Sequence, residues 1–267
     1  MTSRSFTTVL ALAVLVCTRG AEAAPVRVFA VGNEVRVEDV VTVQAFRDKM
    51  FALMDASFPN RGNFVQAGVD DVVSHIQPAD AGAPALVLVN FPEDVGLVAA
   101  MTGTRGAGAR SAISTGGAFL GLLNTYASRI NYYRAKFQGL EQFQALLLAL
   151  TDVNYRVVYE TYRDIAVTYG VYVSAGVNVA EARRVESATE PALVNTLRDS
   201  DEPLRPYAYE AVSPEVHNTT MIFRPDGQVL VPDGTGGVLA APNETGGVLR
   251  GSINKSYLVP LELDLLS

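Results

Sequence analysis

The segment Ala85-Leu-Val-Leu-Val-Asn-Phe-Pro-Glu93 constrains the fold most, because it has the pattern of a buried strand that ends in a carboxylate. Continuous apolar strands usually lie inside a sheet that helices cover on at least one face. A strand is predicted before it at residues 25–32, and a helix at 38–57, where apolar residues recur every three to four positions. The order strand, helix, strand predicts a layered α/β fold.

The middle of the chain changes from a glycine-rich stretch to helical patterns. Residues 103–117 are rich in Gly, Ala and Ser, and we predict a mobile loop there. The apolar residues from Phe119 to Phe137 mark one helix, and residues 143–169 contain one or two more, with Gly170 as the C-cap. Six tyrosines are expected to line helix packing surfaces: Tyr126, Tyr132, Tyr133, Tyr155, Tyr159 and Tyr162.

The last third of the chain has strand patterns. Residues 171–177 predict a third strand, and the charged, Pro-containing residues 181–215 predict a surface insertion. Pro225-Asp226-Gly227 is a strong turn signal, which joins strands at 219–223 and 228–231 into a hairpin. The sequence Thr-Gly-Gly-Val-Leu occurs at 235–239 and again at 245–249. Two copies do not make a solenoid, so we predict two short edge segments or one long loop.

The first 23 residues have the pattern of a cleaved export signal. Arg4 precedes an apolar run from Val9 to Cys17, and Ala21-Glu22-Ala23 matches a signal peptidase site. The run is shorter than the roughly 20 residues that cross a bilayer. We therefore expect a secreted or periplasmic protein without a stable membrane span. A lipoprotein anchor on Cys17 is the weaker alternative, because Val16 stands where such sites usually carry a small residue.

Charge and cysteine content exclude several classes of function. The net charge of −7, with no basic cluster, argues against nucleic acid or anionic membrane as the main partner. Cys17 is the only cysteine, so residues 24–267 hold no thiol for a disulfide, a zinc–thiolate site or a nucleophile. His75 and His217 are far apart and have no companions at ligand spacing. We expect neither a metal site nor a cofactor.

Five segments in order resemble those of the nitrilase superfamily, the carbon–nitrogen hydrolases. They are an opening strand (Val26–Val31), the glutamate strand Leu-Val-Asn-Phe-Pro-Glu-Asp-Val-Gly (88–96), a "helix, Tyr-Gly, strand, Ala-Gly" unit (Tyr162–Gly176), an Asn-Thr strand with a Pro-Asp-Gly turn (Asn218–Gly227) and a lysine segment (Asn254–Pro260). Phe-Pro-Glu alone is only moderately specific, but five such segments in order are much stronger. The resemblance spans most of residues 26–262.

The resemblance implies an α/β fold of the α-β-β-α sandwich type and action on amide-like or nitrile C–N bonds of a small molecule. In that family a cysteine thiolate attacks the substrate carbon, a glutamate moves protons and a lysine stabilises the developing negative charge. The resemblance assigns the proton-transfer role to Glu93 and the charge-stabilising role to Lys255. Glu262 matches an additional glutamate that many members carry. The resemblance also implies association into a homo-oligomer through helical faces. Hydrolysis and acyl transfer to an amine both stay open.

The chain departs from the family pattern at three places. Residues 103–150 are longer and more helical than the usual connection, and residues 231–253 separate the hairpin from the lysine segment. The chain also ends at Ser267, upstream of the family's cysteine. We expect residues 24–267 to be a carbon–nitrogen hydrolase-like domain that is truncated before the nucleophile and incomplete at its C-terminus. Three explanations of the missing nucleophile compete: the sequence is the N-terminal part of a longer protein, which we favour; the gene is truncated; or the chain is a non-catalytic pseudoenzyme or ligand-binding protein of the same fold.

Overall fold

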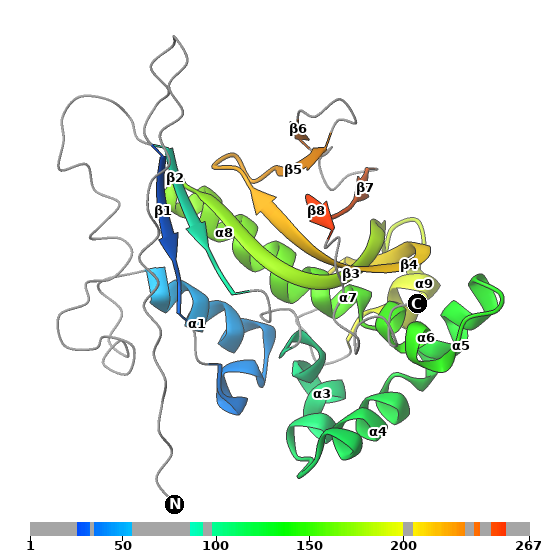
Figure 1. The fold of residues 1–267 in the computed structure, drawn as a ribbon. Helices are drawn as coiled ribbons and strands as arrows, with labels where there is room; N and C mark the ends of the chain where they lie inside the picture. Colours follow the sequence, from blue (N-terminus) through cyan, green and yellow to red (C-terminus); the bar gives the residue numbers. More distant parts are fainter. Residues whose placement is uncertain are drawn as a thin grey trace, which may run out of the picture.

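One mixed sheet organises the computed structural model, which describes residues 26–32, 35–54, 86–92, 98–199, 205–232, 238–240 and 247–254 (Figure 1). Its strands run in the order β1-β2-β3-β4-β5-β6, with β7 on β3 and β8 on β4. The strands are β1 (Val26–Ala30), β2 (Leu86–Asn90), β3 (Tyr172–Glu186), β4 (Tyr207–Phe223), β5 (Val229–Pro232), β6 (Val238–Ala240), β7 (Val248–Leu249) and β8 (Ile253–Asn254). The first three are parallel, and the others pair antiparallel.

Helices pack against this sheet and confirm the predicted α/β class. The described helices are α1 (Val43–Met54), α3 (Gly103–Arg110), α4 (Thr115–Thr125), α5 (Ala127–Lys136), α6 (Gln142–Ala149), α7 (Thr151–Asn154), a π-helical turn (Tyr155–Tyr159), α8 (Glu160–Tyr169) and α9 (Pro191–Leu197), with a short 3₁₀ turn at Val37–Val40. The segment from α7 to α8 follows the long, bent strand β3 (Figure 1). None of the described helices is long and apolar enough to cross a membrane.

The tyrosines of the α7–α8 segment fill the space between helix and sheet, as predicted. Tyr155, Tyr159 and Tyr162 are buried. The ring of Tyr159 lies 5.7 Å from that of Phe223 on β4, and Tyr162 lies 4.6 Å from Phe91, just after β2. Aromatic pairs at these distances bury large areas and hold the helix in one position on the sheet.

Within the described part of the chain, helices cover one face of the β1–β2 end of the sheet. Val89 and Phe91 are buried on the side of the helices. Strand alternation places Val26, Val28 and Leu86 on the opposite side, where they are 46%, 48% and 38% exposed. An apolar strip therefore faces away from the helices along two adjacent, in-register strands.

The prediction of a surface insertion at residues 181–215 is wrong. β3 continues to Glu186 and β4 begins at Tyr207, so much of this stretch belongs to the sheet. Its charges are paired between the strands: Arg183 Nε lies 2.6 Å from Glu210 Oε2, and the Arg184 guanidinium lies 3.7 Å from the ring centre of Tyr207. Such pairs let a strand carry charged residues.

The prediction of a mobile loop at residues 103–117 is also wrong. Most of this stretch is helical, in α3 and the start of α4. A Cβ on Gly121 would lie 3.1 Å from the main-chain carbon of Gly108, so the two helices approach closely where side chains are absent. This packing outweighs the cost of roughly 1 kcal/mol that a glycine imposes on a helix.

Three further predictions concern turns and breaks. Gly170 ends α8 in the left-handed conformation (φ 64°), which confirms the predicted C-cap. The β4–β5 turn at Pro225-Asp226-Gly227 is also confirmed, because Gly227 N donates to Arg224 O at 2.8 Å. The single helix predicted from Phe119 to Phe137 is instead two, since the backbone of Tyr126 (φ −99°, ψ 7°) separates α4 from α5.

The repeated Thr-Gly-Gly-Val-Leu sequences end in two short strands, one of the two outcomes left open. Val238–Ala240 form β6 on β5, whereas Val248–Leu249 form β7 on β3. The two copies therefore pair with different strands and do not stack as structural repeats.

Candidate functional site

The strands that lead to the predicted catalytic residues define the candidate site. Outside the described residues lie Glu93, Lys255, Glu262, Cys17, His75 and the predicted signal peptide at residues 1–23. The described chain reaches Pro92 and Asn254, the immediate neighbours of Glu93 and Lys255. The candidate site is therefore built from β2, β3, β4 and β8.

The end of β2 is fastened to β3. The hydroxyl of Ser174 donates to Asn90 Oδ1, and the N–H of Phe91 donates to the carbonyl of Ser174 at 2.8 Å. The Phe91 ring is buried against Tyr162. Main-chain, side-chain and packing contacts thus fix the backbone two residues before Glu93.

β8 continues the line of β5 along the edge of β4. β5 pairs Val229 with Phe223 and Leu230 with Ile222. Continuing that register would place Pro232 opposite Thr220, the position that Ile253 of β8 takes. The residues between Pro232 and Ile253 therefore form an excursion from a single strand line. The segment that leads to Lys255 returns to the hairpin strand, although more than twenty residues separate them in sequence.

Between β7 and β8, the chain crosses the two long strands β3 and β4. β7 pairs with Ala182 and Arg183 on the edge of β3 that faces away from β4, whereas β8 lies on the outer edge of β4. Gly251 lies on this crossing, and a Cβ there would be 1.8 Å from Thr219 Oγ1. Only glycine allows the main chain to pass this close to β4.

Hydroxyl groups hold the crossing in place. Ser252 Oγ accepts the N–H of Ile222 at 2.8 Å, and the N–H of Ser252 donates to Thr220 O at 2.9 Å. Thr219 Oγ1 donates to the carbonyl of Ile253 at 2.9 Å. These contacts continue up to Asn254 and hold the backbone that precedes Lys255 on β4.

The strands that precede Glu93 and Lys255 run in the same direction. β2 is parallel to β3, and β8 is antiparallel to β4, so β2, β3 and β8 run the same way. Asn90 lies beside Ser174, and Asn254 lies beside Thr219, which pairs with Val177 of β3. Ligands in open α/β sheets bind beyond the carboxyl ends of strands. β3 and β4 lie between the end of β2, which precedes Glu93, and the end of β8, which precedes Lys255.

A cavity of about 330 Å³ adjoins β8. It is lined by three residues of β3, two of β4 and the crossing that leads to Lys255: Val179, Ala180, Glu181, His217, Thr219 and 250–254. The lining combines a carboxylate, a guanidinium, an imidazole, hydroxyls and an amide. Such a set suits the binding of a small polar molecule and contains no strong nucleophile.

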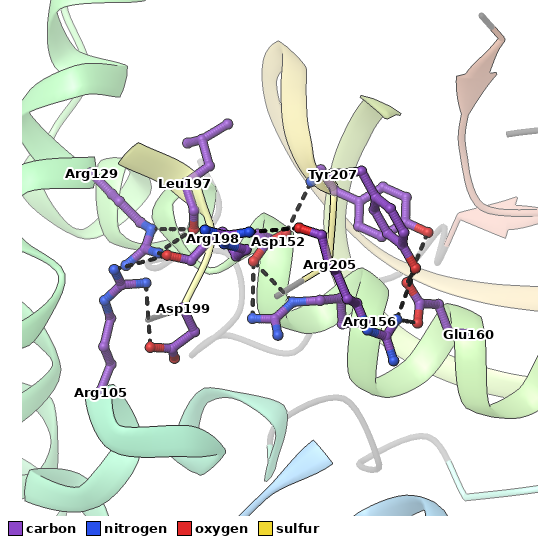
Figure 2. A network of polar contacts seen from close by, with 11 residues as sticks. Arg105, Arg129, Asp152, Arg156, Glu160, Leu197, Arg198, Asp199, Arg205 and Tyr207 are labelled. Carbon is purple, nitrogen blue, oxygen red and sulfur yellow. Dashed lines mark hydrogen bonds and ion pairs between the residues drawn. The ribbon is translucent and has the colours of Figure 1, made fainter. Parts of the chain in front are cut away.

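A second group of ionisable side chains is buried where the α7–α8 segment meets β4 (Figure 2). Asp152 and Arg156 lie one turn apart, with Arg156 Nη2 2.9 Å from the carboxylate. Asp152 Oδ1 also accepts the N–H of Tyr209 at 2.9 Å. One turn further on, Glu160 accepts from the Tyr209 hydroxyl at 3.1 Å and pairs with Arg205.

Two more arginines in Figure 2 bind the end of α9. Arg129 donates from Nε to Leu197 O at 2.6 Å, and Arg105 donates to Arg198 O at 3.0 Å. Arg105 also lies 3.7 Å from Asp199. Cations stabilise the carbonyl groups that a helix leaves unpaired at its C-terminus. We interpret this network as structural, because its bonds fasten residues 197–199 and 205–209 to the helices.

Sequence reasoning did not find this network. The spacing of Asp152, Arg156 and Glu160 at i, i+4 and i+8 was the available signal. The partners on residues 197–209 are too distant in sequence to have been paired with it.

The buried tyrosines do not supply an acid–base group. Burial raises the pKa of Tyr126, Tyr155 and Tyr162 well above the ordinary tyrosine value.

No family model, curated protein or solved structure matches the chain. Among the described residues, no three His, Cys, Asp or Glu side chains are grouped to hold a metal ion.

Proposed function

We propose that this chain carries the glutamate and lysine of a nitrilase-type site, within an α-β-β-α sandwich that acts on amide-like or nitrile C–N bonds. The observation that carries the proposal is the return of β8 to the line of β5. In the family the Asn-Thr strand, the hairpin and the lysine follow one another directly. With the excursion after Pro232 set aside, the same order holds here, and the strand line that leads to Lys255 borders β4.

The exposed apolar strip on β1 and β2 supports the layered sandwich. Val26, Val28 and Leu86 present roughly half-exposed aliphatic side chains on the face opposite the helices. In a sandwich, a second sheet packs about 10 Å above such a face and buries it. Burying each of these side chains would contribute roughly 1 kcal/mol or more.

The proposed roles follow from the chemistry of acyl transfer. A thiolate would attack the carbonyl carbon, Glu93 would move the protons, and Lys255 would stabilise the negative charge that develops on oxygen. Glu262 would keep Lys255 charged in the pocket. Residues 24–267 contain no thiol. In the proposed enzyme, additional residues or a second chain would supply the nucleophile.

The test uses the native protein from its source. We expect an intact mass above that of the 267-residue chain, with a cysteine in the added part, and hydrolysis of simple amides. Glu93→Gln and Lys255→Ala should each lower kcat/KM by about 100-fold or more, with an unchanged circular dichroism spectrum. Glu215→Gln is the matched control, because Glu215 is an exposed acid on β4 whose side chain contacts Ser213. Normal rates in either site variant would remove the assignment.

A non-catalytic ligand-binding protein of the same fold is the second candidate. The cavity beside β8 favours it, because charged groups line the cavity without a nucleophile among them. A native mass equal to that of residues 24–267, with a bound small molecule and no amide turnover, would support this candidate over the enzyme.

A further inference from the structure

The cavity beside β8 is made by the excursion that distinguishes this chain from the family pattern. Val179 and Ala180 of β3 line it together with Gly251 and its neighbours on the crossing. The volume of about 330 Å³ lies at the lower end of the range for small-molecule sites. It suits a compact molecule of few heavy atoms.

Three ionisable side chains line this cavity: Glu181, His217 and Arg250. The nearest approach of Arg250 to Glu181 is 4.0 Å from Nη1 to Oε1, and their side chains are 52% and 40% exposed. That separation is too long for a hydrogen bond. Within the described part of the chain, none of the three side chains makes a hydrogen bond. Other charged groups, such as Glu160 and Glu210, accept two or more each.

The charges restrict the class of ligand. A simple anion that approaches Arg250 meets the carboxylate of Glu181, and a simple cation that approaches Glu181 meets the guanidinium. A molecule with both an ammonium and a carboxylate group satisfies both side chains at once. His217, Thr219 and Asn254 supply further donors and acceptors around its central part.

We propose that this cavity binds a small zwitterion, with its ammonium group on Glu181 and its carboxylate on Arg250. This binding needs no nucleophile, and the proposal does not depend on the chemistry assigned to Glu93 and Lys255. Because the crossing at Gly251 and Ser252 is held to β4, the ligand meets a largely preformed wall. Preformed sites lose less conformational entropy on binding.

Isothermal titration calorimetry with glycine, β-alanine and 4-aminobutyrate tests the proposal. These probes have the same two charged groups at increasing separation. We expect at least one probe to bind at least tenfold more tightly than acetate or methylammonium, its two halves. Glu181→Gln and Arg250→Gln should each weaken that binding by about tenfold or more, since each removes one charged hydrogen-bonding partner.

Arg224→Gln is the matched control, because Arg224 pairs with Asp226 in the β4–β5 turn at similar exposure but does not line the cavity. It should leave the affinity unchanged. The proposal is overturned if no probe binds, if acetate binds as tightly as the best zwitterion, or if both site variants retain full affinity. Amide turnover by the native protein is measured separately, so either proposal can fail alone.

Discussion

At the scale of single residues, close contacts determine which side chains the chain tolerates. Gly251 is the clearest case, because its main chain lies directly against the side chain of Thr219. Glu210 is another. Its buried carboxylate receives hydrogen bonds from Tyr132, Lys136 at 2.5 Å and Arg183 at 2.6 Å. Glu210 belongs to β4, and Gly251 lies against the same strand at Thr219.

Gly251→Ala should lower the free energy of unfolding by about 1–3 kcal/mol, the usual cost of overpacking. The added Cβ would overlap Thr219, which is β-branched and cannot easily rotate away. Thermal or urea unfolding measures the change. Gly116→Ala is the control, since a Cβ there has no atom within 4 Å and alanine favours the helix. Equal stability of the two variants would contradict the close contact.

Glu210→Gln should lower stability by about 2 kcal/mol at neutral pH, because Lys136 and Arg183 lose a buried partner. Burial alone would raise the pKa of Glu210, but hydrogen bonds from Lys136 and Tyr132 bring it below its usual value. A lowered folded-state pKa stabilises the protein above the unfolded value of about 4.3, and this contribution disappears as pH falls through the folded pKa.

Urea unfolding from pH 7 down to pH 3 measures this dependence on pH. The loss of stability below about pH 4.3 should be shallower in Glu210→Gln than in the parent protein. Glu215→Gln, which changes an exposed acid on the same strand, should retain the parent's slope. A Glu210→Gln curve parallel to the parent curve would remove Glu210 from the acid response.

At the scale of elements, the pairing of α3 with α4 shows how packing overrides local propensity. Glycines weaken an isolated helix, yet α3 is helical throughout Gly103–Arg110. Arg110 contributes from within the helix, because its guanidinium donates to Met101 O and to Gly103 O at 2.8 Å. The two helices stabilise each other through their glycine contact and cannot be understood separately.

Gly121→Val should therefore separate α3 from α4 and increase amide hydrogen exchange in α3 by about tenfold or more. The added side chain would meet the main chain of Gly108 and Ala109, at 3.1–3.4 Å from its Cβ. Gly116→Val is the matched control, because it places the same β-branched residue in the same helix in open space. Similar exchange in both variants would mean that helix propensity, and not the contact, decides.

At the scale of the whole molecule, the sheet has unequal faces. Helices bury Val89 and Phe91 on one side, whereas Val26 and Val28 stay about half exposed on the other. This asymmetry suits a structure in which another layer packs against the exposed strip.

Val28→Asp distinguishes a covered face from a free one. In the 267-residue chain we expect a change of about 0.5 kcal/mol or less, because the side chain is about half exposed. In a native protein whose second sheet buries this position, the same change should cost several kcal/mol. Val167→Asp, at a similarly exposed position on α8, should be nearly neutral in both. Equal, small effects in the native protein would argue against the second layer.

The sequence by itself determined the features that depend on neighbours along the chain. The apolar strand at 86–90, the period of α1, the cap at Gly170 and the Pro225-Asp226-Gly227 turn follow from local backbone preferences and side-chain spacing. The apolar strand pattern also marked Glu93, directly after this strand, whereas Lys255 followed only from the resemblance of its segment to a known family.

Only the tertiary structure decided where distant segments meet. The charges in residues 181–215 predicted a surface insertion, but in the structure Arg183 and Glu210 form an ion pair between β3 and β4. The glycines of α3 and α4 predicted a loop, but in the structure they allow the backbones of the two helices to pack closely. The return of β8 to the line of β5 depends on hydrogen bonds between residues far apart in sequence, and no local pattern encodes such contacts.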